Sequence, residues 1–222
     1  MCPQISSVQE GVFFTPPDVL PRGRHKLPRE QVRAAQRERM LAAVTELLAA
    51  HGYRGFGPAD IARRAGVSLE AFYDLFENKD ACVFAGYDRF IGVLLERMRS
   101  IDPPDHATDP ELVRAPLDAY LETLQSDLVV ARAYQVEIDA LGPPARRRRR
   151  DSLRLFADYI RQITIDNLDG EEPDELNASA YVGVVYATRQ LASDALDSAE
   201  EPDLIGLGEE LGVWLTDLFR PR

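Results

Sequence analysis

Between Gly57 and Lys79 the chain reads GPADIARRAGVSLEAFYDLFENK, in which one internal glycine separates two short helical patterns. Gly57 followed by Pro58 is typical of a helix start, because proline fits the first helical position, where the N–H that it lacks has no intrahelical partner. Gly66 ends this helix after about two turns, and Ser68 is a suitable N-cap for the next one. The sequence therefore predicts a short helix, a tight turn and another short helix.

Longer helical patterns flank these residues on both sides. The apolar stripe of the preceding helix consists of Met40, Leu41, Val44, Leu47 and Leu48. That helix begins near Pro28, and we expect Gly52 to end it as a left-handed cap. After Lys79 a further long helix follows, capped by residues 78–80. The two short helices thus have longer neighbours to pack on.

The two short helices meet the packing requirements of a helix-turn-helix. They approach closely only if the first presents a small residue, which Ala62 provides. Gly66 tolerates the positive φ that the turn requires. The apolar residues that hold the crossing angle are Ile61, Ala65, Val67, Phe72 and Leu75. We therefore expect a helix-turn-helix fold.

In this order and spacing, the motifs resemble the DNA-binding end of the TetR family of one-component transcription regulators. The matching residues are Gly52-Tyr53, Asp60-Ile61-Ala62, Ala65-Gly66-Val67-Ser68, Phe72-Tyr73, Phe76 and Lys79. The resemblance covers roughly residues 28–90, and the rest of the chain is similar only in being helical. It implies an all-α fold, with an N-terminal three-helix DNA-binding domain and a C-terminal helical bundle for effector binding and dimerisation.

Two residues depart from the family pattern. The family often has Ser or Thr at the position of Gly57 and Thr at that of Ala71, and these hydroxyls typically bind phosphates. Backbone amides at the helix starts near Pro58, Ser68 and Lys79 are left for this role. The candidate DNA-binding residues are Arg22, Arg24, Lys26, Arg54, Pro58, Ser68, Leu69, Glu70, Ala71, Tyr73, Asp74 and Lys79.

The outward face of the second short helix has two acids and no base: Leu69, Glu70, Tyr73 and Asp74. Tyr73 either offers its hydroxyl to a phosphate, which we favour, or packs on the first helix. The acids either accept hydrogen bonds from cytosine amino groups or are held off the DNA by Arg63 and Arg64. We favour the second interpretation, because acids near phosphates are repelled.

The 222 residues carry a formal net charge of -11, which by itself argues against a nucleic-acid partner. Divided along the chain, residues 1–21 carry -2, residues 22–100 carry +4 and residues 101–222 carry -13. The acidity thus belongs to the C-terminal part. We expect residues 1–27 to be a flexible tail. Its basic arm, residues 22–26, either lies along an anionic surface or is a solvated linker.

No motif in the sequence indicates an enzyme, a metal site or a membrane segment. Two cysteines build no disulfide framework, and three scattered histidines lack zinc-ligand spacing. Nucleophile-elbow and nucleotide-binding motifs do not occur in a suitable context. The apolar runs are too short to span a membrane, and the first residues do not resemble a signal peptide. We expect a cytoplasmic protein that is not an enzyme and needs no cofactor.

Beyond residue 100 the pattern predicts five helices, at about 111–125, 127–141, 144–167, 174–196 and 204–219. Helices with such short connections bury their apolar faces by bundling. The expected domains are a helix-turn-helix domain over residues 28–77 and an effector-binding and dimerisation domain over residues 78–222.

The last two of these helices are the candidate dimer interface, because one has a surface of small residues and the other is more apolar than a single buried face requires. The residues concerned are Ala178, Ala180, Val182, Gly183, Val185 and Ala187, then Leu207, Leu211, Val213, Trp214, Leu215 and Leu218. The alternative is that both helices complete the core of one subunit.

Aromatic residues on otherwise aliphatic helices are candidates to line an effector cavity, with one acid placed to pair with a cationic ligand group. The candidate ligand-binding residues are Tyr120, Tyr134, Glu137, Phe156, Tyr159 and Tyr181. We expect a small, largely apolar effector. The arginine run at residues 146–150 points all round a helix axis, so we interpret it as a solvated patch.

Together these features predict a homodimeric repressor that binds a palindromic double-stranded DNA operator and is released by its effector. The alternative is a helical protein-interaction adaptor, which would explain the acidic recognition face. An activator or an enzyme has less support. Salt-dependent binding to a palindromic operator would separate the first reading from the adaptor.

Overall fold

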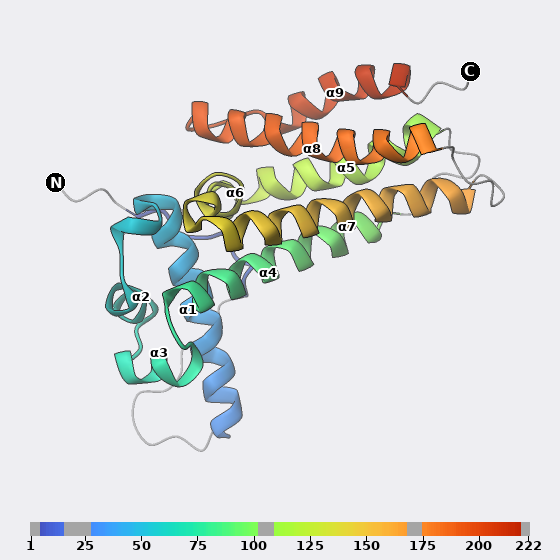
Figure 1. Cartoon of the computed structure of the whole chain (residues 1–222). Coiled ribbons are helices and arrows are strands. Elements are labelled where there is room, and N and C mark those ends of the chain that lie inside the picture. The colour runs from blue at the N-terminus through green and yellow to red at the C-terminus, as the bar shows by residue number, and fades with distance from the viewer. Residues whose placement is uncertain (1–4, 16–27, 102–108, 168–174, 219–222) are drawn as a thin grey trace. The chain divides into compact units, whose positions relative to one another are not determined.

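The computed structural model describes residues 5–15, 28–101, 109–167 and 175–218, and every helix and turn of these ranges is shown in Figure 1. Within them the secondary structure is helical, apart from one isolated bridge between Glu10 and Phe14. The helices are α1 (Arg29–His51), η1 (Tyr53–Gly55), α2 (Pro58–Ala65), α3 (Leu69–Leu75), α4 (Lys79–Arg99), α5 (Asp109–Ser126), α6 (Leu128–Gln135), η2 (Glu137–Leu141), α7 (Pro143–Asn167), α8 (Glu175–Ser198) and α9 (Leu204–Leu218). The all-α fold class predicted from the sequence is confirmed.

The short helices begin and end where the local signals predict. Gly57 is the N-cap of α2 with Pro58 behind it, and Gly66 ends α2 in the left-handed conformation, at φ 66° and ψ 36°. Ser68 Oγ accepts a hydrogen bond of 3.1 Å from the Ala71 N–H at the start of α3. Asn78 Oδ1 does the same for Ala81 at the start of α4, at 2.9 Å. Local capping chemistry therefore sets these boundaries.

Two expectations about helix ends are wrong. Gly52 follows α1 with a positive φ of 63°, but its ψ of 168° is extended and not that of a left-handed cap. The chain turns at this residue directly into η1, which the sequence pattern did not reveal. The helix expected over residues 127–141 is broken, since α6 ends at Gln135 and a 3₁₀ turn, η2, takes over.

The described chain packs as two compact units. Unit 1 comprises residues 1–90 and 129–141, and unit 2 comprises residues 91–128 and 142–222. The helix α4 contributes its first part to unit 1 and its last part to unit 2, and η2 with most of α6 belongs to unit 1. The division by packing does not test the functional boundary predicted at residue 77. That boundary stays a prediction.

In unit 1, α1 packs against η1, α2 and α3, and α2 packs against α3. The apolar stripe predicted for α1 is buried, with Met40, Leu41 and Leu48 fully enclosed. From α6, the ring of Tyr134 enters the same core, where it packs on Tyr87 and Phe90 with ring centroids 6.0 and 5.3 Å away. The core of unit 1 therefore combines the N-terminal helices with α6, which lies much later in the sequence.

Within residues 5–15, Phe13 and Phe14 belong to the core of unit 1, contrary to the expectation of a flexible tail over residues 1–27. Phe13 and Phe14 are each 1% exposed, and the Phe13 ring stacks on Phe90 at a centroid distance of 5.5 Å. The carbonyl of Phe13 accepts a hydrogen bond of 3.3 Å from Arg89. Two adjacent phenylalanines buried in this way order the chain around them. Residues 1–4 and 16–27 lie outside the described part.

Unit 2 is a bundle of helices. The helix α5 packs on α7 and α9, α7 on α8, and α8 on α9, so that these four run alongside one another in Figure 1. Buried side chains from each of them form the core, including Leu117, Leu153, Val184 and Leu211. Among the described residues, no helix is both long and apolar enough to cross a membrane.

Candidate nucleic-acid interface and effector cavity

The turn between α2 and α3 has the geometry of a helix-turn-helix. The Val67 N–H donates to the Ala62 carbonyl at 2.9 Å, which brings the chain back over the end of α2. Ile61 and Ala62 of α2 and Phe72 of α3 are 0 to 3% exposed, and they form the contact between the two helices. The small residue, the glycine turn and the apolar contacts predicted from the sequence are therefore all found in place.

The opposite face of α3 is open to solvent. Leu69 is 44% and Tyr73 55% exposed, and Glu70 and Asp74 are exposed as well. Tyr73 points outward as expected, with its ring edge-on to Phe72 at 5.3 Å. Its proposed bond to a phosphate stays a prediction. Four adjacent exposed side chains on the second helix of this motif form the surface expected to enter a DNA groove.

Arg63 and Arg64 do not hold the two acids of α3, so the interpretation that we favoured from the sequence is wrong. Arg63 pairs with Asp60 on its own helix, and Arg64 Nε lies 2.6 Å from Glu46 Oε2 of α1. In the described part of the chain, no ion pair joins Glu70 or Asp74 to a cation. Both acids face solvent, and the Arg33 guanidinium donates to the main-chain carbonyl of Asp74 at 3.1 Å.

The pairing of Arg64 explains why the sequence was misleading. Its partner Glu46 is a largely buried acid of α1 that also accepts a hydrogen bond of 3.1 Å from the Val8 N–H. A second nitrogen of Arg64 donates to Ser7 Oγ at 3.2 Å. These contacts join residues 38 and 57 positions apart, which helical periodicity does not indicate.

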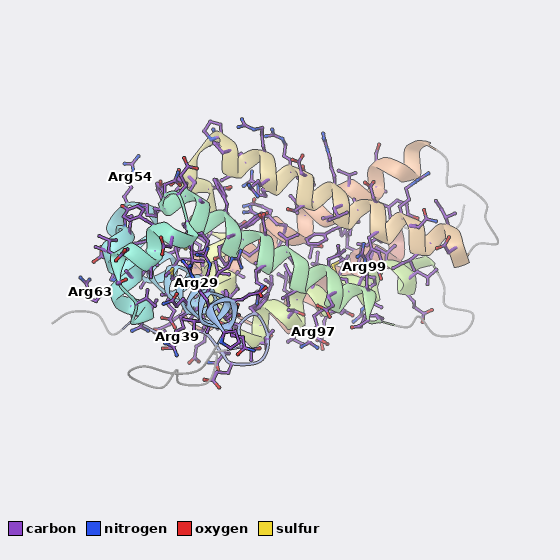
Figure 2. The ribbon with its side chains drawn as sticks, turned by 90° about the horizontal axis from the view of Figure 1, so that it is seen from below. Arg29, Arg39, Arg54, Arg63, Arg97 and Arg99 are labelled. Carbon is purple, nitrogen blue, oxygen red and sulfur yellow. The ribbon has the colours of Figure 1, made fainter. Side chains whose placement is uncertain are left out.

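Arg54 and Lys79, two of the cations proposed to bind DNA, have different surroundings. Arg54 is exposed in η1, and Figure 2 shows it projecting from the ribbon, as Arg63 does. Lys79 Nζ is half-buried and donates to the carbonyls of Tyr53 and Phe56, at 2.7 and 3.0 Å. The ammonium group also lies over both aromatic rings, at 3.9 and 4.9 Å from their centroids.

Lys79 therefore fastens η1 to the start of α4. Burial lowers the pKa of its ammonium group. Two of its three N–H groups are engaged in the two carbonyl bonds, so a phosphate has one remaining donor to bind. Tyr53 donates its hydroxyl to Asp80, and burial with this bond raises the pKa of Tyr53 to about 12.

The remaining candidates for DNA binding are placed as follows. Pro58 is the first residue of α2, and Ser68 and Ala71 lie at the start of α3. Because the Ala71 N–H already donates to Ser68 Oγ, this amide is not free for a phosphate. Arg22, Arg24 and Lys26 lie outside the described residues.

The candidate ligand-binding residues are divided between the two units. Tyr134 and Glu137 lie in unit 1, whereas Tyr120, Phe156, Tyr159 and Tyr181 lie in unit 2. The hydroxyl of Tyr134 lies 2.8 Å from Thr45 Oγ1, and a Cβ atom at Gly86 would clash with it. Tyr134 is thus a tightly packed core residue. Its proposed contact with a ligand has no support in these contacts.

Unit 2 contains a small apolar cavity of about 10 Å³, which is room for a single water molecule. Its walls come from α4, α5, α7 and α8: Met98, Leu117, Tyr120, Leu153, Phe156, Val185 and Thr188. Tyr120 and Phe156 were expected here, and their rings meet edge-on at 6.2 Å. The other five were missed, because aliphatic residues that line a small cavity have the same helical spacing as those that fill a core.

Tyr159 and Tyr181 are not among the residues that line this cavity. The Tyr159 hydroxyl donates to the carbonyl of Met98 at 3.0 Å, and the Arg99 guanidinium lies over its ring at 5.7 Å. Burial raises the pKa of this hydroxyl. Tyr181 is buried on α8, one turn before Val185. Within the described ranges, no group of acids, histidines and cysteines is arranged to hold a metal ion.

The model of the bacterial regulatory proteins of the tetR family matches residues 40–85, the region of the helix-turn-helix. Over these residues the chain is similar to the DNA-binding region of the tetR family. The match supports a DNA-binding transcriptional regulator, in which α3 is the second helix of the helix-turn-helix. The match covers the turn, the exposed face of α3 and Lys79, which are the features that the resemblance was based on.

Other similar proteins match over much of the chain. The fatty acid metabolism regulator protein of Bacillus subtilis is 23% identical over 150 residues, which are 67% of this chain and 77% of that protein. The structure of the fatty acid degradation regulator FadR from Bacillus halodurans superposes with a TM-score of 0.72 at 18% identity, and the match covers 90% of this chain and all of that one.

A further similar structure was solved with a ligand. It is the transcriptional regulator FadR of Bacillus subtilis in complex with stearoyl-CoA, with a TM-score of 0.67, 21% identity and coverage of 80% of this chain and 96% of that one. At these identities the structural likeness establishes the shared fold.

Proposed function

We propose that this protein is a homodimeric repressor that leaves a palindromic operator when an acyl-CoA binds in unit 2. The helix-turn-helix with the open face of α3, in the region that matches the tetR family, carries the DNA-binding part of the proposal. Two similar proteins are named as fatty acid regulators, and the similar structure of FadR from Bacillus subtilis was solved with stearoyl-CoA, which supports an acyl thioester as the effector. Because its target is DNA, the proposal also places the protein in the cytoplasm.

The dimer is proposed to form through α8 and α9. Large apolar side chains on these helices are exposed in the single chain: Val182, Tyr186, Leu191, Ile205, Val213 and Trp214. Val213, at 72%, is the most exposed of them, and burial against a second copy would remove this apolar surface from water. The side chains of Ala178 and Leu218, also expected here, lie outside the described part.

A symmetric dimer presents two copies of α3, which bind half-sites about 34–36 Å apart in successive major grooves. The exposed bases Arg54 and Arg63 lie on the same unit as α3 and are proposed to contact phosphates. Because α4 contributes residues to both units, we propose that it carries the signal from the effector to α3. The effector must bind the DNA-incompetent state more tightly, since equal affinities would shift nothing.

The test begins with selection of bound sites from random duplex DNA by the full-length protein. We expect a palindrome, bound with an affinity that falls steeply with salt because phosphate contacts release counterions. Octanoyl-CoA and stearoyl-CoA are then added to the complex, with free CoA as the control. Release by an acyl-CoA but not by CoA is the expected result. An acyl-CoA that binds equally well to free and to operator-bound protein would contradict the proposal, and the absence of any selected site would favour the adaptor.

A further inference from the structure

Residues 146–154 of α7 are strongly basic, although the C-terminal part of the chain is acidic. They contain six arginines and one aspartate and so carry +5, whereas residues 101–222 as a whole carry -13. Three of these arginines share one face of the helix. Arg147, Arg150 and Arg154 follow one another at intervals of three and four residues, which places them within about 60° around the axis.

These three arginines, which we call the basic face of α7, are exposed and lack acidic partners in the described part of the chain. No ion pair or hydrogen bond joins their guanidinium groups to another described residue. Asp151 and Asp158 stand four residues after Arg147 and Arg154, yet neither pair closes to ion-pair distance. An exposed pair of this kind is weak, and the order with the base first is the less favourable one. The basic face is therefore available to a partner.

This concentration of charge is unfavourable for the folded chain by itself. Arg150 lies three residues from Arg147 and four from both Arg146 and Arg154, and like charges at these spacings destabilise a helix. The first turn of α7 also carries the positive end of the helix dipole, which disfavours cations there. Glutamine has a similar helix propensity without these penalties. Folding does not require the arginines, which indicates a partner of opposite charge.

The DNA backbone fits the basic face in chemistry and in length. The planar guanidinium fork of arginine matches phosphate geometry, with two parallel hydrogen bonds. From Arg147 to Arg154 the helix rises by about 10 Å, which corresponds to about three phosphates of one strand at about 3.4 Å each along the duplex axis. Along the chain, the basic face begins six residues after Leu141, the last residue of unit 1, and unit 1 also contains α3.

We propose that the basic face of α7 binds phosphates of the DNA backbone while α3 lies in its groove. This inference rests on the DNA binding of the proposed function and adds to it a contact made by unit 2. Phosphate contacts carry no sequence information. The basic face therefore contributes to the affinity and to its salt dependence, but not to the choice of operator.

The test measures the affinity of the full-length protein for its selected operator over a series of salt concentrations. A triple variant with Arg147→Gln, Arg150→Gln and Arg154→Gln should give a shallower slope of log affinity against log salt concentration. The expected change is about 0.9 for each arginine in each subunit, hence about 5 for a dimer, and the selected sequence should stay the same. An unchanged slope would overturn the inference and leave the proposed function intact. If the unmodified protein selects no site, both fail.

Arg97→Gln is the matched control, because Arg97 is an exposed arginine of the same unit that lies on α4 (Figure 2). It should leave the slope unchanged. Without DNA, Arg150→Gln should not lower the melting temperature, and a lower value would show that folding requires this arginine, which overturns the inference. Flotation with phosphatidylglycerol vesicles tests the other polyanionic surface. Vesicle binding that the triple variant loses, at an unchanged salt slope for DNA, would assign the basic face to a membrane and overturn the inference.

Discussion

Replacement of Phe13 by alanine tests whether the N-terminal residues are part of unit 1. The ring is 1% exposed and stacks on Phe90, so the substitution leaves a cavity in a packed core. Removal of a buried phenylalanine usually costs about 3–5 kcal/mol, part of which is the loss of the aromatic pair, at about 0.5–1.5 kcal/mol. In a flexible tail the same change would lie within about 0.5 kcal/mol of zero. The two accounts therefore differ by several kcal/mol.

The assay is unfolding in urea, followed by far-ultraviolet circular dichroism and by the fluorescence of Trp214. This is the single tryptophan of the chain and it lies in unit 2, so the two signals together tell whether the loss is confined to unit 1. Leu69→Ala is the control, because Leu69 is an exposed apolar residue of the same unit. A loss of less than about 1 kcal/mol for Phe13→Ala would refute the packing described for residues 5–15.

Three further changes test other parts of the molecule. Glu70→Gln removes a negative charge from the exposed face of α3. If Glu70 accepts a hydrogen bond from cytosine, the sites selected from random DNA should change at one base pair, by about 1–3 kcal/mol of discrimination. A uniform gain in affinity for all sites would show that Glu70 only repels phosphates. Gly86→Ala places a methyl group against the Tyr134 hydroxyl and should destabilise the protein by about 1–3 kcal/mol, measured by thermal unfolding. Tyr134→Phe should restore part of this loss, and no restoration would mean that the clash is elsewhere. Val213→Glu should give a monomer in size-exclusion chromatography with light scattering, and an unchanged dimer would exclude α9 from the interface.

The features that the sequence predicted correctly depend on contacts between residues that are close together in the chain. Pro58 after Gly57, Gly66 in the turn and Ser68 as a cap each act through bonds to residues a few positions away, so their roles are readable from a short window. The same holds for the outward position of Tyr73, since the spacing of a helix fixes which residues share a face.

Long-range pairing was not predictable in this way. The contacts of Phe13 with α4 join residues 76 positions apart, and no local pattern distinguishes two phenylalanines of a tail from two that are buried. For the same reason, the sequence did not show that Arg64 pairs with Glu46 of α1 instead of lying beside the acids of α3. Tyr120, Tyr134, Phe156 and Tyr181 are buried, but the sequence did not indicate which of the two units would bury each of them.

This last point has a consequence for engineering. Unit 1 includes residues 129–141, so a fragment that stops near residue 90 would lack the Tyr134 ring that packs on Tyr87 and Phe90. A chimera that joins this DNA-binding part to the sensor of a relative at a single crossover in α4 would leave a mismatched insert in that core. Exchange of sensors between such regulators therefore needs two further junctions, one on either side of α6 and η2. This short segment must come from the same parent as the DNA-binding helices, whereas the bundle before and after it comes from the other parent.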